Sequence, residues 1–418
     1  MTTFTATGFY RLESVDGLWW LVTPDGEPFL SKGVNHVSFH GDHAPELGYS
    51  PYEQAVSEQY SNKVKWAGAA VERLREWGFN TVGAWSSDTT YTHGLAYTPV
   101  LNIAARAGGD WQYGVFPDVF APHFAVIAEQ IAGESCATRC NDPNLLGYFT
   151  DNELRWGPDW RSDHTLLVDF WEMPPNAPGR AAAVDYVRQF YEDDLDRFNR
   201  TWGTDYPTWE RLTAVGRWDK LLQPETQPDE LAALNDGFVC RVAAQYFRVC
   251  HEAIRQHDPN HLIMGCRFAG YAPRPVIESM GDYVDVVSYN NYDVLPPEDR
   301  LCEIHEWTGK PVLLTEFSFK AQDSGLPNTH GAGEPVATQQ DRADHYARYV
   351  KALVKLPYMV GFHWFKYADQ PAEGRFDGEN SNYGLVRLDD TAYTELTERM
   401  QAVNPTLDTM HTAANRPG

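Results

Sequence analysis

The chain has 418 residues, of which 43% are hydrophobic and 13% aromatic, and its formal net charge is −24 with neutral histidines. This much apolar material excludes a wholly disordered chain, and the negative charge argues against a nucleic-acid partner or an anionic membrane surface. The sequence has no run of about 18 apolar residues, no basic and apolar leader, and too few cysteines (six) for a disulfide scaffold, so we expect free thiols and a cytoplasmic location.

The first elements predict a small antiparallel layer. Residues 9–15 and 18–22 flank Asp16-Gly17, which is a strong hairpin signal. A second turn leads into residues 28–36, the expected first core strand. We therefore predict a hairpin layer over residues 1–32 that packs on a catalytic domain of residues 33–403, followed by a poorly structured tail at 404–418.

Helical and strand patterns then alternate along the chain. The helical patterns lie at 60–77, 124–132, 181–198, 236–257 and 339–355, and the apolar strand runs at 79–85, 97–103, 145–150, 262–266, 284–289, 312–315 and 360–365. With the run ending at Asn35 these make eight strands, which are apolar throughout, as expected of parallel strands buried on both faces. The pattern predicts an α/β fold, a single (β/α)8 TIM barrel with long insertions at the strand ends. An open doubly wound sheet is the alternative, although no G-x-G-x-x-G follows the first strand.

Polar residues follow most of these strand runs, at the end of a barrel where active sites lie. They are Asn35-His36, Trp85-Ser86, Asp151-Asn152-Glu153, Arg267, Tyr289-Asn290, Glu316 and His363-Trp364. A glutamate in such a position costs folding energy unless it is paired or useful. Each of Glu153 and Glu316 could simply pair with an arginine or cap a helix. Two glutamates that face one pocket are, however, the minimal apparatus for breaking a glycosidic bond.

An Asn-Glu pair that ends the fourth strand and a Glu that ends the seventh resemble the signature of glycoside hydrolase clan A, whose members are retaining (β/α)8-barrel enzymes. Within the clan the chain resembles the family 50 β-agarases and their agarase-like relatives. The motifs that carry the resemblance are Gly17-Leu18-Trp19-Trp20-Leu21-Val22, Gly33-Val34-Asn35-His36, Asn80-Thr81-Val82-Gly83-Ala84-Trp85-Ser86, Gly147-Tyr148-Phe149-Thr150-Asp151-Asn152-Glu153-Leu154 and Leu314-Thr315-Glu316-Phe317-Ser318.

The resemblance implies a role for four residues. Glu153 would be the acid/base and Glu316 the nucleophile, Asn152 would bind the sugar 2-hydroxyl, and Tyr289 would hold the Glu316 carboxylate. The residues themselves agree with these roles. Trp156 and Trp160 follow Glu153 and would raise its pKa, while donors such as Tyr289 and Arg267 would keep Glu316 ionised.

Other strand-end residues are candidates for binding sugar. Aromatic rings stack on the apolar faces of sugars, and the candidates for stacking are Trp85, Trp156, Trp160, Trp171, Trp364, Tyr367 and Phe376. Core packing is an equal alternative for each of them. The candidates for binding hydroxyl groups are Asn35, His36, Arg267, Asn290 and His363.

No metal or other cofactor is predicted. His36, His40, His43 and Asp42 have a spacing that a zinc site could use, but sugar binding or loop packing is the simpler interpretation. Cys136 and Cys140 form a lone C-x-x-x-C, a weak metal signal that favours free thiols instead.

The sequence therefore predicts a retaining β-glycoside hydrolase that acts on a neutral, galactose-containing oligo- or polysaccharide. An exo-acting β-galactosidase or β-glucosidase is one alternative, and a non-catalytic saccharide-binding barrel is another. The expected partner is the saccharide substrate, with no nucleic acid and no membrane, and the sequence makes no prediction of the oligomeric state.

Overall fold

The chain begins with the predicted hairpin. A computed structural model describes residues 4–218, 227–269 and 272–414. In it β1 (Arg11–Val15) and β2 (Leu18–Val22) pair antiparallel, and Asp16 and Gly17 between them have φ of 53° and 82°. Two positive φ angles are what a tight hairpin turn requires, and Asp-Gly tolerates them. β3 (Pro28–Phe29) adds a third antiparallel strand next to β2.

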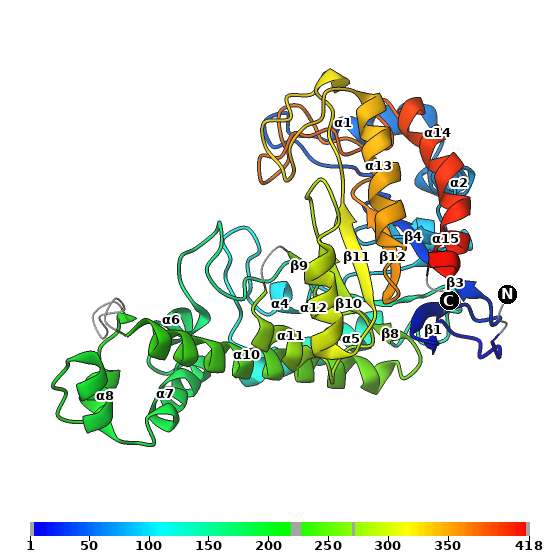
Figure 1. Ribbon diagram of the computed structural model, residues 1–418. Coiled ribbons are helices and arrows are strands. Elements are labelled where there is room, and N and C mark those ends of the chain that lie inside the picture. The colour runs from blue at the N-terminus through cyan, green and yellow to red at the C-terminus, as the bar shows by residue number, and fades with distance from the viewer. Residues whose placement is uncertain (1–3, 219–226, 270–271, 415–418) are drawn as a thin grey trace.

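The centre of the protein is parallel β-structure (Figure 1). Its strands among the described residues are β4 (Ser31–Val34), β5 (Thr81–Val82), β6 (Ala96–Tyr97), β7 (Gly147–Tyr148), β8 (Leu262–Ile263), β9 (Phe268–Ala269), β10 (Val287–Asn290), β11 (Val312–Phe317) and β12 (Met359–Trp364). Seven of them form one sheet in the order β6-β5-β4-β12-β11-β10-β9, while β7 and β8 pair with each other. Each of the eight predicted strand runs overlaps one of these strands, and β9 was not predicted. The strand positions confirm an α/β fold with a parallel sheet.

The two sheets are linked at their edges. Single parallel bridges join Tyr97 to Leu145 and Val100 to Phe149, on the β6 side of β7. On the other side, the amide of Asp285, just before β10, donates to the carbonyl of Ile263 in β8 at 2.8 Å. Among the described residues the strand pairing does not close into one eight-stranded ring, so the closed barrel stays a prediction.

Helices separate the strands. They are α1 (Pro51–Gln59), α2 (Lys63–Glu76), α3 (Asp88–Tyr91), α4 (Ile103–Arg106), α5 (Pro122–Ser135), α6 (Leu166–Trp171), α7 (Pro178–Phe190), α8 (Leu195–Trp202), α9 (Trp209–Thr213), α10 (Pro228–His257), α11 (Arg274–Met280), α12 (Glu298–Thr308), α13 (Gln339–Leu353), α14 (Thr394–Val403) and α15 (Leu407–Ala414). Local sequence explains several of their ends. Thr338 and Asp341, for example, form a capping box at the start of α13.

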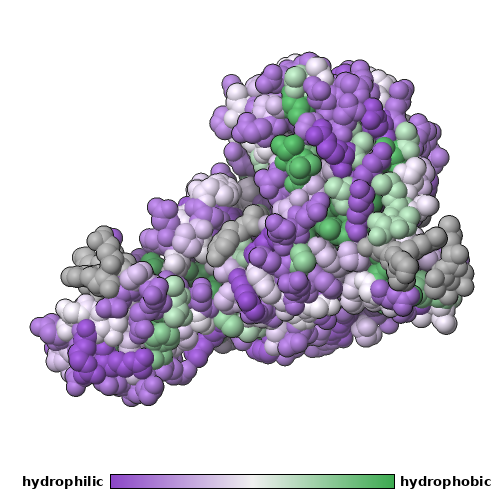
Figure 2. Space-filling view, viewed as in Figure 1, coloured by the Kyte–Doolittle hydropathy of each residue, from purple (hydrophilic) through white to green (hydrophobic). Residues whose placement is uncertain are grey.

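The insertion between β7 and α10 forms a helical lobe. In Figures 1 and 2 the lobe, with α7 and α8, projects from the body, and the visible face is mostly hydrophilic. The single helix predicted for 181–198 is wrong. The chain turns between α7 and α8, because Glu192 and Asp193 have φ of 54° and 60° and Asp194 caps the start of α8.

The prediction of a poorly structured tail is also wrong for residues 404–414. Residues 404–414 form a short 3-10 turn (Asn404–Thr406) and α15, and Leu407 and His411 of this segment are fully buried. Residues 415–418 of the predicted tail lie outside the described residues. Each helix in the described part of the chain is too short or too polar to cross a bilayer.

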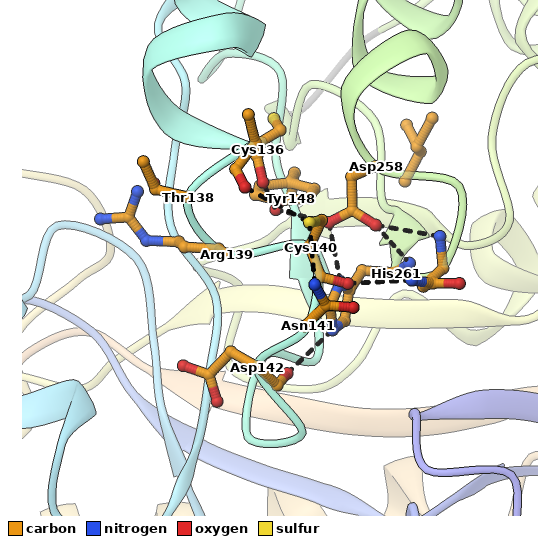
Figure 3. Close-up of polar contacts among 12 residues, drawn as sticks. Cys136, Thr138, Arg139, Cys140, Asn141, Asp142, Tyr148, Asp258 and His261 are labelled. Atoms are coloured by element: carbon orange, nitrogen blue, oxygen red, sulfur yellow. Dashed lines mark hydrogen bonds and ion pairs between the residues drawn. The ribbon is translucent and has the colours of Figure 1, made fainter.

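A buried polar cluster occupies the end of β7 and β8 where these strands begin. The Tyr148 hydroxyl donates to Asp258 at 2.7 Å, and His261 lies 2.7 Å from the same carboxylate (Figure 3). The other ring nitrogen of His261 lies 2.9 Å from the carbonyl of Asp142. Cys136 is buried beside Tyr148, and the cysteines are free thiols, as predicted.

Candidate active site

A cavity of about 1680 Å³ opens where the parallel strands end. Glu153, five residues after β7, and Glu316, within β11, both line it. His36, Trp85 and Asn290, which follow or end three further strands, line it as well. The fold therefore brings the two glutamates, which are far apart in sequence, to one cavity.

Five residues at the strand ends have a left-handed backbone. They are His36 (φ 53°), Trp85 (φ 64°), Asn102 (φ 58°), Glu153 (φ 50°) and Arg267 (φ 50°). This conformation costs a residue other than glycine about 1–2 kcal/mol, and such strain clusters at functional sites. Each of the five lies just after one of the parallel strands, and all but Arg267 line the cavity.

Glu316 is held by two donors. Nη2 of Arg267 lies 2.8 Å from its Oε1, and the Tyr292 hydroxyl donates to its Oε2 at 2.7 Å. The side chain of Arg267 is fully buried and also donates to Asn152 Oδ1 at 2.8 Å and to the carbonyl of Thr315 at 2.9 Å. The Glu316 carboxylate is thus fixed in one orientation at the cavity wall.

The tyrosine that hydrogen-bonds to Glu316 differs from the predicted one. Tyr289 was expected to hold the carboxylate, but the hydroxyl that donates to it belongs to Tyr292. Tyr289 hydrogen-bonds to Arg300 instead. The pairing of β10 with β11 shifts register between Tyr289 and Asn290, so alternation along the strand no longer predicts which side chain faces Glu316.

Glu153 accepts two hydrogen bonds from neutral groups. Asn290 Nδ2 donates to its Oε1 at 2.9 Å, and the indole N–H of Trp111 donates to its Oε2 at 3.1 Å. Burial, followed by the nearby charge of Glu316, raises the pKa of Glu153 to about 7, although these donors and Arg267 oppose the shift.

The aromatic neighbour of Glu153 is Trp111, which the sequence analysis missed. Trp156 is 3% exposed and stacks on Phe247 in the core, with ring centroids 5.6 Å apart, while Trp160 is 74% exposed on the cavity rim. Trp111 follows no strand directly, since it lies in the loop after α4. No pattern in the sequence marks this loop as part of the site.

The other predicted residues divide into two groups. Asn152, Asn290, Trp85 and His36 line the cavity with the two glutamates. Arg267 lies behind this wall, with its guanidinium 5.8 Å from the Trp85 ring.

Asn35, His363, Trp364 and Trp156 lie outside the cavity lining, which corrects their predicted contact with sugar. Asn35 binds the carbonyl of Thr315 and the amide of Ala84, at 2.7 and 2.9 Å. His363 lies 2.8 Å from the Ser31 hydroxyl, and the indole of Trp364 donates to a backbone carbonyl at 3.0 Å. All four side chains are buried among their packing and hydrogen-bond partners in the interior. Trp171 and Tyr367 are fully buried as well.

A charged cluster forms another part of the cavity wall. Lys366 is ion-paired with Asp42, and Arg375 contacts Asp377 and Glu379 at 2.8 and 2.7 Å. Asp42 also lies 3.7 Å from His36, whose pKa is lowered to about 3 by burial and by the Lys366 charge. His36 is therefore neutral at physiological pH.

The histidines considered as a zinc site lie apart. His40 contacts Glu53 at 2.8 Å, and His43 is exposed. Within residues 4–218, 227–269 and 272–414, no group of three or more His, Cys, Asp or Glu side chains is arranged to hold a metal ion.

Exposed aromatic rings surround the mouth beside Glu153. Trp111 contacts Trp160 and Phe376 edge-on, with ring centroids 5.8 and 6.3 Å apart, and Phe376 is 61% exposed. The site thus combines a carboxyl group of raised pKa, a second carboxylate fixed by a cation, and apolar ring surfaces. Two carboxyl groups in such different environments can serve as an acid and a nucleophile.

Comparison with known proteins places the chain beside agarases. No family model matches it. Beta-agarase A of Vibrio sp. (strain JT0107) is 31% identical over an alignment that covers 96% of this chain and 46% of that protein. Beta-agarase B of the same strain is 29% identical over an alignment that covers 95% of this chain and 48% of that protein. The chain therefore spans about half the length of these curated relatives. A solved exo-beta-agarase structure superposes with a TM-score of 0.85 at 26% identity, covering 98% of this chain and 66% of the other.

Proposed function

We propose that this chain is a retaining β-glycoside hydrolase of clan A, related to the family 50 β-agarases, that cleaves agarose-type saccharides. The observation that carries the proposal is the pair of carboxyl groups in one cavity. Glu153 has a raised pKa, and Glu316 is held by Arg267 and Tyr292. The names of its relatives, both β-agarases, support the substrate class.

The reaction proceeds in two displacements. Glu316 attacks the anomeric carbon, and the C–O bond to the leaving sugar breaks as Glu153 gives its proton to the leaving oxygen. Glu153, now a carboxylate, then removes a proton from water, and that water displaces Glu316 from the sugar. The raised pKa supports the first step because Glu153 must carry a proton near neutral pH.

The remaining cavity residues fit a neutral sugar. Asn152 shares its donors with the two glutamates. Its Oδ1 accepts from Arg267, which binds Glu316, and from Asn290, which binds Glu153. This position suits a contact with the sugar 2-hydroxyl. The exposed faces of Trp160 and Phe376 offer stacking surfaces for further sugar units. The net charge of −24 disfavours a polyanionic substrate.

The proposal includes a closed barrel for the catalytic domain of residues 33–403. Its support is the pairing of the first parallel strand, β4, with the last, β12, over four residue pairs. The links from β6 to β7 and from β8 to the start of β10 join the remaining edges. An open doubly wound sheet does not pair its first strand with its last in this way.

Two variants test the proposed function. Glu316→Gln and Glu153→Gln keep the shape of each side chain but remove the nucleophile or the proton donor. On agaro-oligosaccharides we expect kcat to fall by roughly 10³-fold or more for each variant. The exposed Glu58→Gln serves as the matched control and should match wild type. Undiminished turnover by Glu316→Gln would overturn the proposal.

Product analysis separates the alternatives. NMR of the first product should show the β-anomer, because two displacements retain configuration. The release of single galactose or glucose units would indicate an exo-β-galactosidase or β-glucosidase. Binding without turnover by the wild-type chain would indicate a saccharide-binding protein.

A further inference from the structure

Trp111 reaches Glu153 from a separate loop. Its indole N–H donates to Glu153 Oε2 at 3.1 Å, while Asn290 occupies the other carboxyl oxygen at 2.9 Å. Asn290 belongs to strand β10, but Trp111 lies in a loop that a single bridge, Asp110 to Val115, closes. Something outside this loop must hold the indole in place, because loops are less rigid than the sheet.

Arg161 provides that connection. Its Nη1 donates to the backbone carbonyls of both Trp111 and Glu153, at 3.0 Å each. One guanidinium nitrogen therefore ties the residue that donates the indole bond to the residue that accepts it. The side chain of Arg161 is 4% exposed, so these bonds are shielded from water.

Arg161 is itself fixed. Asp159 accepts from its Nε at 3.0 Å and from its Nη2 at 2.6 Å, and the guanidinium lies 5.2 Å from the Trp160 ring centroid. Gly114 of the loop packs against Arg155 and Arg161, since a Cβ there would lie 2.8 Å from Arg155 Cδ and 3.0 Å from Arg161 Cβ, and its φ of +64° also favours glycine. The loop thus rests on these two arginines with no room for a larger residue at Gly114.

We propose that Trp111 and Arg161 are positioning residues for the proton donor: Arg161 locks the two loops together, and Trp111 orients the Glu153 carboxyl toward the leaving oxygen. This inference rests on the proposed role of Glu153 and goes beyond it. The indole bond also favours the ionised form of Glu153, so it limits how far burial raises the pKa of that group.

Trp111→Phe tests the indole bond. This variant keeps an aromatic ring but removes the donor, so the alkaline limb of the pH profile of kcat/KM should move to higher pH by about half a unit or more. The loss of kcat should be about tenfold for a substrate with a poor leaving group. It should be much smaller for an activated aryl β-galactoside, whose leaving group departs without a proton.

Arg161→Lys tests the link between the loops. A lysine ammonium lacks the planar fork that fits both carbonyls and Asp159. We expect the same dependence on the leaving group, with a loss of kcat of about tenfold to a hundredfold. Thermal unfolding of both variants is measured alongside, so that a change in stability is separated from a change in proton donation.

Each variant has a matched control far from the cavity. Trp209→Phe also removes an indole hydrogen bond, in this case to the backbone carbonyl of Asp193 at 3.2 Å. Arg180→Lys also removes a buried arginine that bridges two carbonyls, those of Met173 and Thr213 at 2.9 and 2.8 Å. Both controls should keep the wild-type pH profile and leaving-group dependence.

The outcomes distinguish the two proposals. If Trp111→Phe and Arg161→Lys match their controls in pH profile and leaving-group dependence, the positioning role is overturned while the proposed function stands. If Glu153→Gln hydrolyses both substrate types as fast as wild type, the proposed function fails, and the positioning role fails with it. If Arg161→Lys does not fold, the pH profile and leaving-group dependence of Trp111→Phe alone test the positioning role.

Discussion

At the scale of single residues, the two glutamates differ in what surrounds them. Glu316 meets a guanidinium and a phenol hydroxyl, whereas Glu153 meets an amide and an indole. Only one of the two therefore has a cation bonded directly to its carboxyl group. This asymmetry underlies the assignment of the proton donor to Glu153.

The raised pKa of Glu153 predicts a pH-dependent stability. Because the pKa in the folded state, about 7, lies above the ordinary value of 4.5, the protonated carboxyl favours folding at low pH. That contribution is complete below about pH 4.5 and is lost as the pH rises to about 7. Burial also raises the pKa of Asp151 to about 7, so this residue likewise lowers the stability of the fold as the pH rises.

Glu153→Gln isolates the contribution of this carboxyl group. A neutral amide avoids the buried charge, so at pH 8 the variant should unfold about 1–2 °C higher than wild type. At pH 4.5 the difference should shrink, because Glu153 is then protonated. Scanning calorimetry at the two pH values measures both differences, and an equal shift at both would contradict the explanation.

At the scale of elements, close contacts between neighbouring strands require glycines. A Cβ on Gly33 in β4 would lie 2.3 Å from the ring of His363 in β12. One on Gly83 would lie 2.4 Å from Asn35 Oδ1. His363 and Asn35 are held in place by Ser31 and Thr315, so they cannot move aside cheaply.

Gly33→Ala should therefore destabilise the sheet. Overpacking of a rigid interior costs about 1–3 kcal/mol in the free energy of unfolding, which urea denaturation measures. Gly216→Ala is the control, since Gly216 is exposed and a Cβ there meets nothing within 4 Å. Similar midpoints for the two variants would show that the sheet relaxes around the added methyl group.

At the scale of the whole molecule, the two ends of the chain pack together. The C-terminal helix α15 lies against the N-terminal hairpin, with the ring of His411 4.7 Å from that of Trp20 (Figure 1). The two ring nitrogens of His411 lie 2.6 Å from the carbonyl of Val354 and 3.0 Å from that of Trp19. One buried side chain thus joins the hairpin, the end of α13 and the C-terminal helix.

His411→Ala should lower the free energy of unfolding, because it removes the side chain that joins these three elements. The loss of the polar contacts with these buried carbonyls, together with the lost ring contact, should cost about 2 kcal/mol of unfolding free energy. The exposed His123→Ala serves as the control and should be neutral. Equal stability of the two variants would show that α15 adds little to the fold.

Local sequence was sufficient for the hairpin, for most of the parallel strands and for the two glutamates. The hairpin at Asp16-Gly17 and the parallel strands follow from turn chemistry and from apolar runs, which act over a few residues. The positions of Glu153 and Glu316 after such runs were enough to predict that both reach one cavity. The break between α7 and α8 was not predicted. It depends on positive φ angles at Glu192 and Asp193, neither of which is a glycine.

Only the tertiary structure decided what surrounds the glutamates. Tyr292, two residues beyond the end of β10, binds Glu316 in place of Tyr289, and Trp111 reaches Glu153 from a loop whose backbone Arg161 binds. Whether a strand-end side chain enters the cavity or the core depends on the backbone turn at that residue and on the partners across the sheet. The partners of the two glutamates lie 24 to 137 residues away in sequence, so a local pattern cannot predict them.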